Sequence, residues 1–250
     1  MNWRFVDSDL KEPAYTVAAD EAMALARSKG IVPNTLHFYR RKYPTVSLGY
    51  FQKVNEALDF NFCEKNDVRI VRRITGGSAI YTDSNHLIYG LAVDEGTLPG
   101  TREQTFEHVC SAIVVALESL SIKASFKPIN DVLVEGRKIS GSAQMRRRGI
   151  ILQHGTIVLR NEPEMMMGAL KMDKNKIKHS GLEPGTYVTS LTEVMDGPFD
   201  LAKVKQALVK GFEKVFHINF DHCRFSKFEN DKIDELVRTK YGTKEWNFKL

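Results

Sequence analysis

Short apolar runs and longer segments with helical spacing alternate along the first hundred residues. Runs rich in β-branched and aromatic side chains predict strands at 36–40, 46–51, 68–73, 79–82 and 87–93. The segments 14–28, closed by Gly30, and 55–66 instead have the spacing of amphipathic helices. Because Gly76-Gly77 falls between two of the strands, the pattern predicts a tight strand, glycine turn, strand unit.

The longest predicted helix begins at Thr101, whose spacing to Gln104 matches a capping box. Its apolar stripe has clean helical periodicity and consists of Phe106, Val109, Cys110, Ile113, Leu117 and Leu120. Three strands then follow at 132–134, 138–144 and 150–159, and Glu135-Gly136 joins the first two as a hairpin. Adjacent hairpins predict a largely antiparallel sheet.

From Pro163 the pattern becomes mostly helical. Helices are predicted at 163–170, at 201–216 with Asp200 as N-cap, and at 229–240, with loop signals at 181–185 and 196–198. No repeat or domain boundary interrupts the chain. We therefore expect one α+β domain over residues 1–250, with a mixed, largely antiparallel central sheet flanked by helices and a mostly helical part at 163–250.

Composition narrows the class of protein. A hydrophobic fraction of 42% supports a real core, and no apolar run approaches the ~18 residues of a membrane span, so a cytoplasmic protein without membrane association is expected. The net charge of +5 favours acidic partners. The basic run Arg146-Arg147-Arg148 has no interleaved aromatic residues, which favours a solvated turn or an acidic protein partner over nucleic acid.

The three cysteines, Cys63, Cys110 and Cys223, lack CxxC spacing and are interpreted as packing residues of helices or strands. Two histidines, His217 and His222, fall near Cys223 in a predicted loop. Without a fourth ligand this group makes a weak metal site, and no structural metal is assigned.

The segment from Arg72 to Ser78 is the first candidate for chemistry. It joins two adjacent arginines to Gly76-Gly77 at a strand end. Glycines there let backbone N–H groups approach a ligand, and an arginine fork can bind phosphate or carboxylate. A simple hairpin turn with solvated arginines is an equally good interpretation.

The second candidate surrounds Lys138. Its neighbours are Asn130 and Asp131 before it, the small-residue segment Ser140 to Gln144 after it, and His154 on the next strand. A half-buried lysine calls for an anion, and a fixed cation can stabilise charge that develops during group transfer. A solvated hairpin lysine and a satisfied strand histidine are the alternatives. Asp131 would orient a lysine, bind Mg²⁺ or form a turn. No P-loop, GxGxxG or GxSxG spacing is present.

Together these segments resemble the lipoate–protein ligase family, within its superfamily of biotin–protein ligases and octanoyltransferases, over nearly the whole chain. Their order and spacing carry the resemblance; the segments are Trp3-Arg4-Phe5-Val6-Asp7, Asp20-Glu21-Ala22, Leu48-Gly49-Tyr50-Phe51-Gln52, Arg72-Arg73-Ile74-Thr75-Gly76-Gly77, Asn130-Asp131-Val132, Gly136 to Gln144, His154-Gly155-Thr156 and Lys240 to Asn247.

The resemblance implies a class II synthetase or biotin–lipoate ligase-like fold and an ATP-dependent lipoate–protein ligase. Lipoate or octanoate and Mg-ATP would give an acyl-adenylate, which a lysine of a lipoyl domain of a 2-oxoacid dehydrogenase, or of the glycine cleavage H protein, would attack. Lys138 is the expected catalytic residue. The residues expected to bind the acyl substrate are Tyr50, Arg72, Gly76, Gly77, Ser78, Ser140, Gly141, Ser142, Ala143 and His154. Those expected at the nucleotide are Arg73, Thr82, Asp83, Asn130 and Lys138, with Asp131 at Mg²⁺.

Departures from the family pattern keep alternatives open. Ser78 replaces the usual third glycine, Thr82-Asp83 stands where His-Asp is common, and no accessory domain follows, so adenylation would call for a separate accessory subunit. An ATP-independent octanoyl or lipoyl transferase is the main rival. Its thioester chemistry uses a cysteine before 132–134 or after 159, and neither place has one here. A biotin ligase, whose basic glycine-rich signature is missing, and a non-catalytic lipoate-binding protein are weaker alternatives.

Overall fold

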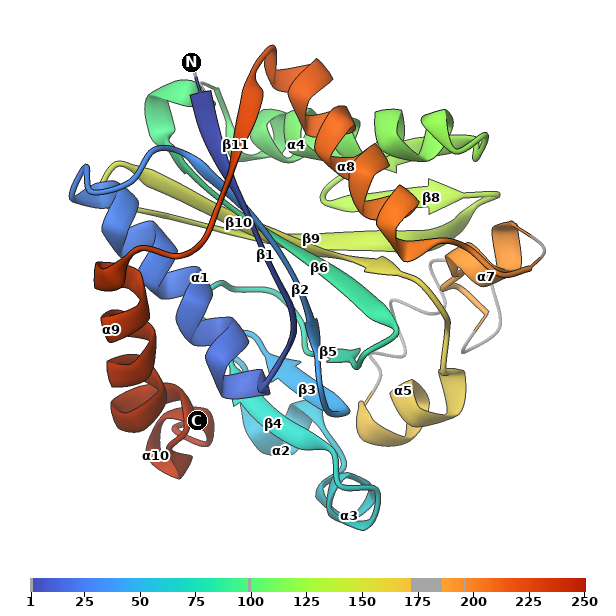
Figure 1. Ribbon diagram of the computed structural model, residues 1–250. Coiled ribbons are helices and arrows are strands. Elements are labelled where there is room, and N and C mark those ends of the chain that lie inside the picture. Colours follow the sequence, from blue (N-terminus) through green and yellow to red (C-terminus); the bar gives the residue numbers. More distant parts are fainter. Residues whose placement is uncertain (1, 99, 172–185, 196) are drawn as a thin grey trace.

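An eight-stranded mixed sheet forms the centre of the fold (Figure 1). The computed structural model describes residues 2–98, 100–171, 186–195 and 197–250. Strand β1 is parallel to both of its neighbours and every other neighbouring pair is antiparallel, which confirms the predicted α+β class and largely antiparallel sheet. The strands, in spatial order, are β11 (Asn219–Cys223), β1 (Asn2–Lys11), β2 (Thr35–Arg41), β6 (His86–Asp94), β10 (Ile150–Val158), β9 (Arg137–Arg147), β8 (Asp131–Val134) and β7 (Ala124–Lys127).

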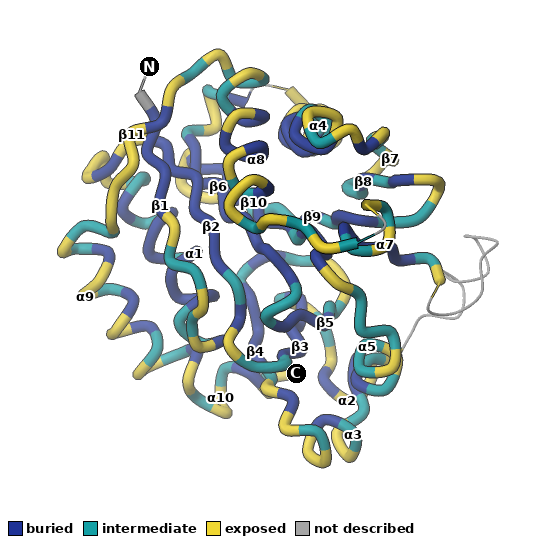
Figure 2. Tube along the Cα trace, turned by 45° about the vertical axis from the view of Figure 1, so that its right-hand side comes forward, coloured by how far each residue is buried: buried dark blue, intermediate teal, exposed yellow. Residues whose placement is uncertain are grey.

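Helices cover both faces of this sheet. Helices α4 (Arg102–Ser119) and α8 (Leu201–Phe216) pack on one face, and α1 (Pro13–Ser28) lies on the other (Figure 1). The strands between them are mostly buried (Figure 2). The predicted stripe of α4 enters the main core from Val109 to Leu120, where each large apolar side chain contributes roughly 1.5–3 kcal/mol. The predicted capping box is present, because the Thr101 side chain accepts from the Gln104 N–H.

A second, three-stranded sheet has β3 (Thr45–Leu48) at its centre, with β4 (Arg69–Arg72) parallel and β5 (Ile80–Thr82) antiparallel to it. The predicted strand, glycine turn, strand unit is therefore wrong as a pairing, because β3 lies between the strands that the glycine segment connects. The helix predicted at 55–66 is two helices, α2 (Val54–Ala57) and α3 (Phe60–Lys65). Leu58 leaves the helix to bridge Leu170, and Asp59 caps α3. Helix α5 (Pro163–Ala169) packs beside α3.

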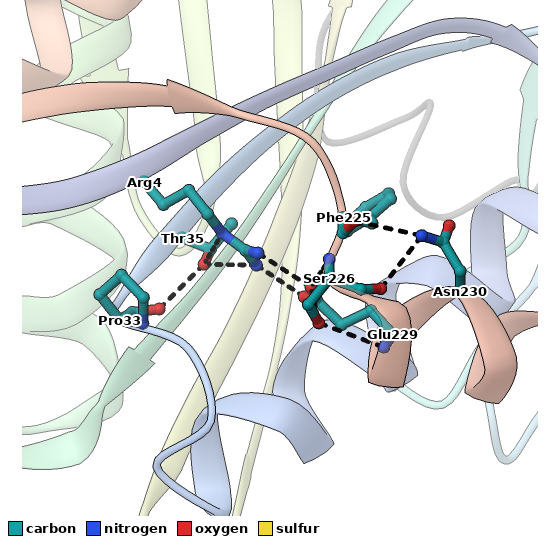
Figure 3. A network of polar contacts seen from close by, with 7 residues as sticks. All are labelled: Arg4, Pro33, Thr35, Phe225, Ser226, Glu229 and Asn230. Atoms are coloured by element: carbon teal, nitrogen blue, oxygen red, sulfur yellow. Dashed lines mark hydrogen bonds and ion pairs between the residues drawn. The ribbon is translucent and has the colours of Figure 1, made fainter.

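The C-terminal part crosses back over the molecule. Helix α9 (Lys227–Leu236) packs on α1, followed by a π-helical turn (Val237–Tyr241) and α10 (Lys244–Asn247). Figure 3 shows how α9 is fixed to β1. Arg4 donates two hydrogen bonds, of 2.6 and 2.8 Å, to the buried carboxylate of Glu229, which also accepts from the Ser226 N–H. Such a fully hydrogen-bonded pair is what makes a buried charge tolerable.

Three strands were not predicted from the pattern: β1, β7 and β11. The segment expected as a loop with two histidines and a cysteine is mostly β11, the edge strand beside β1, and Cys223 is exposed there rather than packed. Two short elements complete the described fold, a 3-10 turn (Glu95–Thr97) and α7 (Leu191–Val194). The loop predicted at 181–185, and residue 196 of the loop predicted at 196–198, lie outside the described residues. Within the described ranges, no helix has both the length and the apolar character needed to cross a membrane.

Candidate active site

Lys138 enters the site near the start of β9, at the point where β9 also bonds to the segment before α7. Its N–H donates to the Tyr187 carbonyl at 2.7 Å and its carbonyl accepts from the Thr189 N–H at 2.8 Å. These bonds fix the backbone on both sides of the residue. The side chain then crosses Gly141, where an added Cβ would lie 2.4 Å from both Cε and Nζ of Lys138. The Lys138 side chain therefore lies along the sheet, and 31% of it is exposed.

Asp131 holds the other side of this ammonium. Its Oδ1 lies 2.7 Å from Lys138 Nζ, an ion pair that lacks the alignment of a hydrogen bond. Its neighbour Asn130 turns the other way, because the Asn130 amide donates to the Ser142 carbonyl and the Ser142 N–H donates to the Asn130 carbonyl. Asn130 therefore ties the β7–β8 hairpin to β9. The structure brings Lys138 and Asp131 together, as the sequence suggested.

A pocket of about 80 Å³ opens beside Lys138. Ser140 and Gly141 line it on β9, and its other side is mainly apolar. The Ser140 hydroxyl is buried and has no hydrogen-bond partner in the described structure. The apolar and aromatic residues that line the pocket come from β5 and the residue before it, β9, β10, α5 and its C-cap, and the segment before α7; they are Ala79, Ile80, Tyr81, Ile139, Val158, Met166, Leu170, Tyr187 and Val188. A cation at the edge of an apolar pocket suits an apolar chain that ends in a polarised carbonyl.

The glycine segment between β4 and β5 lies on the same side of the sheet. Gly77 has a left-handed φ of 92° and approaches Ala143 of β9. We call residues Thr75 to Ser78 the glycine loop. Ala143 is two residues from Gly141, so the loop and the Lys138 side chain occupy neighbouring positions along β9. Tyr50, whose N–H donates to the Thr75 carbonyl at 2.9 Å, holds the other side of the loop.

The two predicted arginines are buried supports of this loop. Arg72 is fully buried, and its Nη1 donates to the carbonyls of Gly49, Tyr50 and Gln52. Arg73 donates to the carbonyls of Gly76 and Ser78 at 2.7 and 2.8 Å. Burial, and secondarily the charge of Arg41, lower the pKa of Arg73 to about 9, which still leaves it cationic at neutral pH. Both side chains bind backbone oxygens, and their predicted contacts with substrate or nucleotide stay predictions.

Thr82 and Asp83, predicted at the nucleotide, are held by protein groups. Thr82 is buried and its hydroxyl accepts from Arg41 at 2.7 Å. Burial alone would raise the pKa of Asp83, but hydrogen bonds from His86, Asn85 and Tyr81 hold it below its ordinary value. Neither side chain lines the pocket beside Lys138.

His154 and Ser142 lie deeper in the sheet. The His154 ring contacts Asp20 Oδ2 through Nδ1 at 2.7 Å and Thr75 Oγ1 through Nε2 at 2.8 Å. The Ser142 hydroxyl lies 2.7 Å from the Tyr89 hydroxyl, on the face covered by α4. Asp20 and Thr75 were absent from the predicted site. The available signal was the position of Asp20 on the apolar face of the helix at 14–28, three residues from both Val17 and Met23, where a charge is unusual.

None of the cysteines lies beside Lys138. Cys63 is buried in α3, and Cys223 is exposed on β11. Cys110 is fully buried in α4, where its Sγ lies 3.8 Å from Ser142 Oγ and burial raises the pKa of its thiol to about 12. A thiol that stays protonated and buried is a poor nucleophile. The interpretation of Cys63 and Cys110 as packing residues is thus consistent with the structure.

The predicted binding of Mg²⁺ by Asp131 stays a prediction. The described ranges contain no group of three or more histidine, cysteine, aspartate or glutamate side chains arranged for a metal. The carboxylate of Asp131 pairs with Lys138, and Glu162 is a second carboxylate that lines the pocket. We therefore derive no chemical step through a metal.

The fold and site belong to a class of protein in which a mixed sheet carries a glycine loop beside a strand lysine. The sequence model of the lipoyl protein ligase A/B catalytic domain matches residues 12–213. The chain belongs to this family, which confirms the resemblance drawn from the motifs.

Two groups of relatives cover nearly the whole chain. The octanoyltransferases LipM of Geobacillus kaustophilus and Carboxydothermus hydrogenoformans are each 32% identical to it, covering 99% of this chain and 98% and 99% of theirs. A bipartite lipoate–protein ligase, solved as part of a study with its E2 lipoyl domain from Thermoplasma acidophilum, is 27% identical with a TM-score of 0.87, covering 99% of this chain and 96% of that one. A lipoate–protein ligase A bound with ATP is 26% identical with the same TM-score of 0.87, covering 99% of both chains.

These relatives correct one expectation from the sequence. The chain is an enzyme of the family that modifies proteins with lipoyl or octanoyl groups, with lipoate or octanoate as the substrate class. The more specific prediction of an ATP-dependent ligase that forms an acyl-adenylate is wrong, because the curated relatives at 30–32% identity over 99% of the chain are named octanoyltransferases. The motifs that suggested a ligase describe a scaffold common to both activities.

Proposed function

We propose that this enzyme transfers an octanoyl group from a thioester donor to a lysine of a lipoyl-type acceptor domain, without ATP. The names of the curated relatives support the reaction class. The observation that supports this chemistry most directly is the position of Lys138. Its side chain lies over Gly141, and the residue lines the edge of a mainly apolar pocket.

The reaction needs no oxidant, metal or nucleotide. The acceptor amine, after losing a proton to solvent, attacks the carbonyl carbon of the donor thioester and forms a C–N bond. The C–S bond then breaks, and the donor leaves as a thiolate that takes up a proton. The products are an octanoylated lysine amide and a free thiol. Negative charge develops on the carbonyl oxygen between these two bond changes.

Lys138 is the group placed to stabilise that oxygen. A fixed cation in a partly desolvated site lowers the energy of a developing oxyanion, and such an interaction is typically worth about 10²–10³ in rate. Asp131 keeps the ammonium in one place at 2.7 Å. In the free enzyme the carboxylate offsets the cost of holding this charge away from bulk water.

The pocket beside Lys138 is the proposed binding site of the acyl chain. Ile80, Val158 and Met166 offer apolar contact, while Lys138 marks the carbonyl end. Ser140 and Gly141 of β9 line the same pocket. This arrangement supports an acyl chain that points away from Lys138, with the reactive carbon at the open edge.

The transfer is proposed to be direct, without an acyl-cysteine intermediate. Cys110 is fully buried on α4, and neither Cys63 nor Cys223 lines the pocket. The loop before β8, one of the two places where the resemblance expected a nucleophilic cysteine, reads Pro128-Ile129-Asn130. Donor and acceptor must then be bound at the same time.

The proposed acceptor is a lipoyl domain of a 2-oxoacid dehydrogenase or the related glycine cleavage H protein. The Thermoplasma relative, whose solved system includes an E2 lipoyl domain, supports this class of partner. The net charge of +5 would favour encounter with an acidic domain.

The test is the mass of an acceptor lipoyl domain after incubation with the enzyme. One reaction contains an octanoyl thioester of a carrier protein without ATP, and the other contains octanoate, ATP and Mg²⁺. We expect octanoylation of the acceptor lysine only in the first reaction. Modification that depends on ATP and free octanoate, with none from the thioester, would overturn the proposal.

A further inference from the structure

Four directly opposed residues form a row across the neighbouring strands β2, β6, β10 and β9, beneath α1. His37 of β2 is opposite Gly90 of β6, Gly90 is opposite His154 of β10, and His154 is opposite Ala143 of β9. Directly opposed residues in a sheet present their side chains on the same face. Two histidines therefore flank a glycine, and Ala143 at the end of the row lies under the glycine loop.

Asp20 of α1 fills the gap that Gly90 leaves. A Cβ on Gly90 would lie 2.7 Å from Asp20 Oδ1, so any side chain there would displace the carboxylate. Asp20 is 1% exposed, and its Oδ2 contacts both the Tyr39 hydroxyl at 3.2 Å and His154 Nδ1 at 2.7 Å. Its Oδ1 has no hydrogen-bond partner in the described structure. A buried carboxylate with one unpartnered oxygen is costly, which argues for a role beyond packing.

The contacts of Asp20 determine the direction of the hydrogen bonds that follow. Because a carboxylate oxygen is the natural acceptor at Nδ1, we assign the ring proton of His154 to Nδ1, which leaves Nε2 as an acceptor. The Thr75 hydroxyl, 2.8 Å away, then donates to Nε2, and its oxygen accepts from Arg73 Nε at 3.0 Å. In this arrangement each donor from His154 Nδ1 to Arg73 Nε meets an acceptor.

We propose that Asp20, acting through His154 and Thr75, is a positioning residue that fixes the glycine loop beside Lys138. Thr75 is the first residue of the loop and is fully buried. Gly77, two residues on, approaches Ala143, which is two residues from Gly141 under the Lys138 side chain. We call this chain of contacts, from Asp20 through His154 to Thr75, the relay. It sets the distance between the glycine loop and the proposed oxyanion position. Its effect on turnover rests on the proposed acyl transfer, whereas its hydrogen bonds do not.

The first test observes the tautomer of His154 directly. Long-range ¹⁵N–¹H correlation spectra of the ¹⁵N-histidine-labelled enzyme, assigned with His154→Gln, distinguish a proton on Nδ1 from one on Nε2. We expect the Nδ1–H form in the wild-type protein and loss of this preference in Asp20→Asn. An Nε2–H tautomer in the wild-type protein would overturn the relay, whatever activity the enzyme has.

The second test separates positioning from stability. Thr75→Val removes the donor with little change in shape, Thr75→Ser retains it, and Thr45→Val is a matched control. Thr45 is also fully buried and donates only to the Tyr43 carbonyl of its own turn. We expect kcat for acyl transfer to fall at least tenfold in Thr75→Val, to recover in Thr75→Ser, and to stay unchanged in Thr45→Val.

Two outcomes of the second test contradict the proposal: wild-type kcat in Thr75→Val, or an equal loss in Thr45→Val at equal loss of stability. If the wild-type enzyme transfers no acyl group from any thioester, the proposed function fails. The tautomer spectra still decide the relay in that case.

Discussion

The side chain of Lys138 lies across the Cα of Gly141, so closely that a Cβ there would be 2.4 Å from both Cε and Nζ. The two residues are three apart on β9, and a register shift between Val132 and Leu133 of β8 brings Asp131 opposite Gly141. The glycine therefore makes room for the ammonium above the sheet. This contact explains why the segment after Lys138 has a glycine at position 141.

Gly141→Ala should move the Lys138 ammonium while the fold is kept, since no left-handed backbone angle is needed at this position. A displacement of about 1 Å in a catalytic group can cost about 10² in rate, and we expect a loss of kcat of this order. Gly96→Ala is the control, because an added Cβ there meets nothing within 4 Å. Steady-state transfer assays with thermal unfolding of both variants check the prediction. Equal kcat in the two variants would exclude a role for the crossing.

Met166→Ala should change the preferred length of the acyl chain. Met166 lines the pocket beside Lys138, so its truncation lengthens the apolar space, and transfer of acyl groups longer than octanoyl should rise relative to octanoyl. Met167→Ala on the same helix is the control, because Met167 is an exposed residue that does not line the pocket. Competition between donors of different length measures the ratio. An unchanged ratio in Met166→Ala would place the acyl chain elsewhere.

Arg72→Met should destabilise the protein by about 3 kcal/mol, because buried carbonyls of Gly49, Tyr50 and Gln52 lose their charged donor. Arg69→Met on the same strand should change stability by less than about 1 kcal/mol, since Arg69 is exposed and pairs only at the surface. Urea unfolding measures both. If Arg72→Met instead keeps full stability and loses substrate binding, the role in acyl binding predicted from the sequence is the better one.

His37 should make the protein less stable in acid. Burial lowers the pKa of His37 from 6.5 to about 4, so between these values the unfolded chain binds a proton that the folded protein does not. The loss of folding stability caused by His37 is absent above pH 6.5, grows as the pH falls, and is complete below about 4. Between pH 7 and pH 5 it should cost about 2 kcal/mol.

His37→Gln should therefore lose about 2 kcal/mol less than the wild-type protein between pH 7 and pH 5 in urea unfolding. Acidic groups elsewhere respond to pH in both proteins and cancel in the comparison. The same pH dependence in both proteins would show that His37 is protonated in the folded state.

The sequence correctly predicted the helix caps and the hairpin turn, because these depend on residues that are close together in the chain. The capping box at Thr101, the N-cap at Asp200 and the hairpin at Glu135-Gly136 all form as the residue types require. The sequence also placed Lys138 and Asp131 at one site. These features rest on residues near one another in the chain.

Other features depend on contacts that no local pattern contains. Strand β3 separates β4 from β5, and β11 pairs with a strand from the opposite end of the chain. The arginines beside the glycine loop have the fork geometry that binds phosphate or carboxylate, but the folded chain supplies backbone carbonyls as their partners. The contact between Asp20 of α1 and Gly90 of β6 likewise forms only in the tertiary structure.

The central claim, direct acyl transfer assisted by Lys138 without a cysteine nucleophile, is tested most directly by single-turnover transfer from an octanoyl carrier thioester in the absence of ATP. The compared enzymes are the wild-type protein, Lys138→Ala, and a variant in which Cys63, Cys110 and Cys223 are all alanine. We expect Lys138→Ala to keep its fold and lose transfer by about 10² or more, while the cysteine-free variant keeps its rate within a few fold. Loss of transfer in a folded cysteine-free variant, or undiminished transfer by Lys138→Ala, would contradict the account.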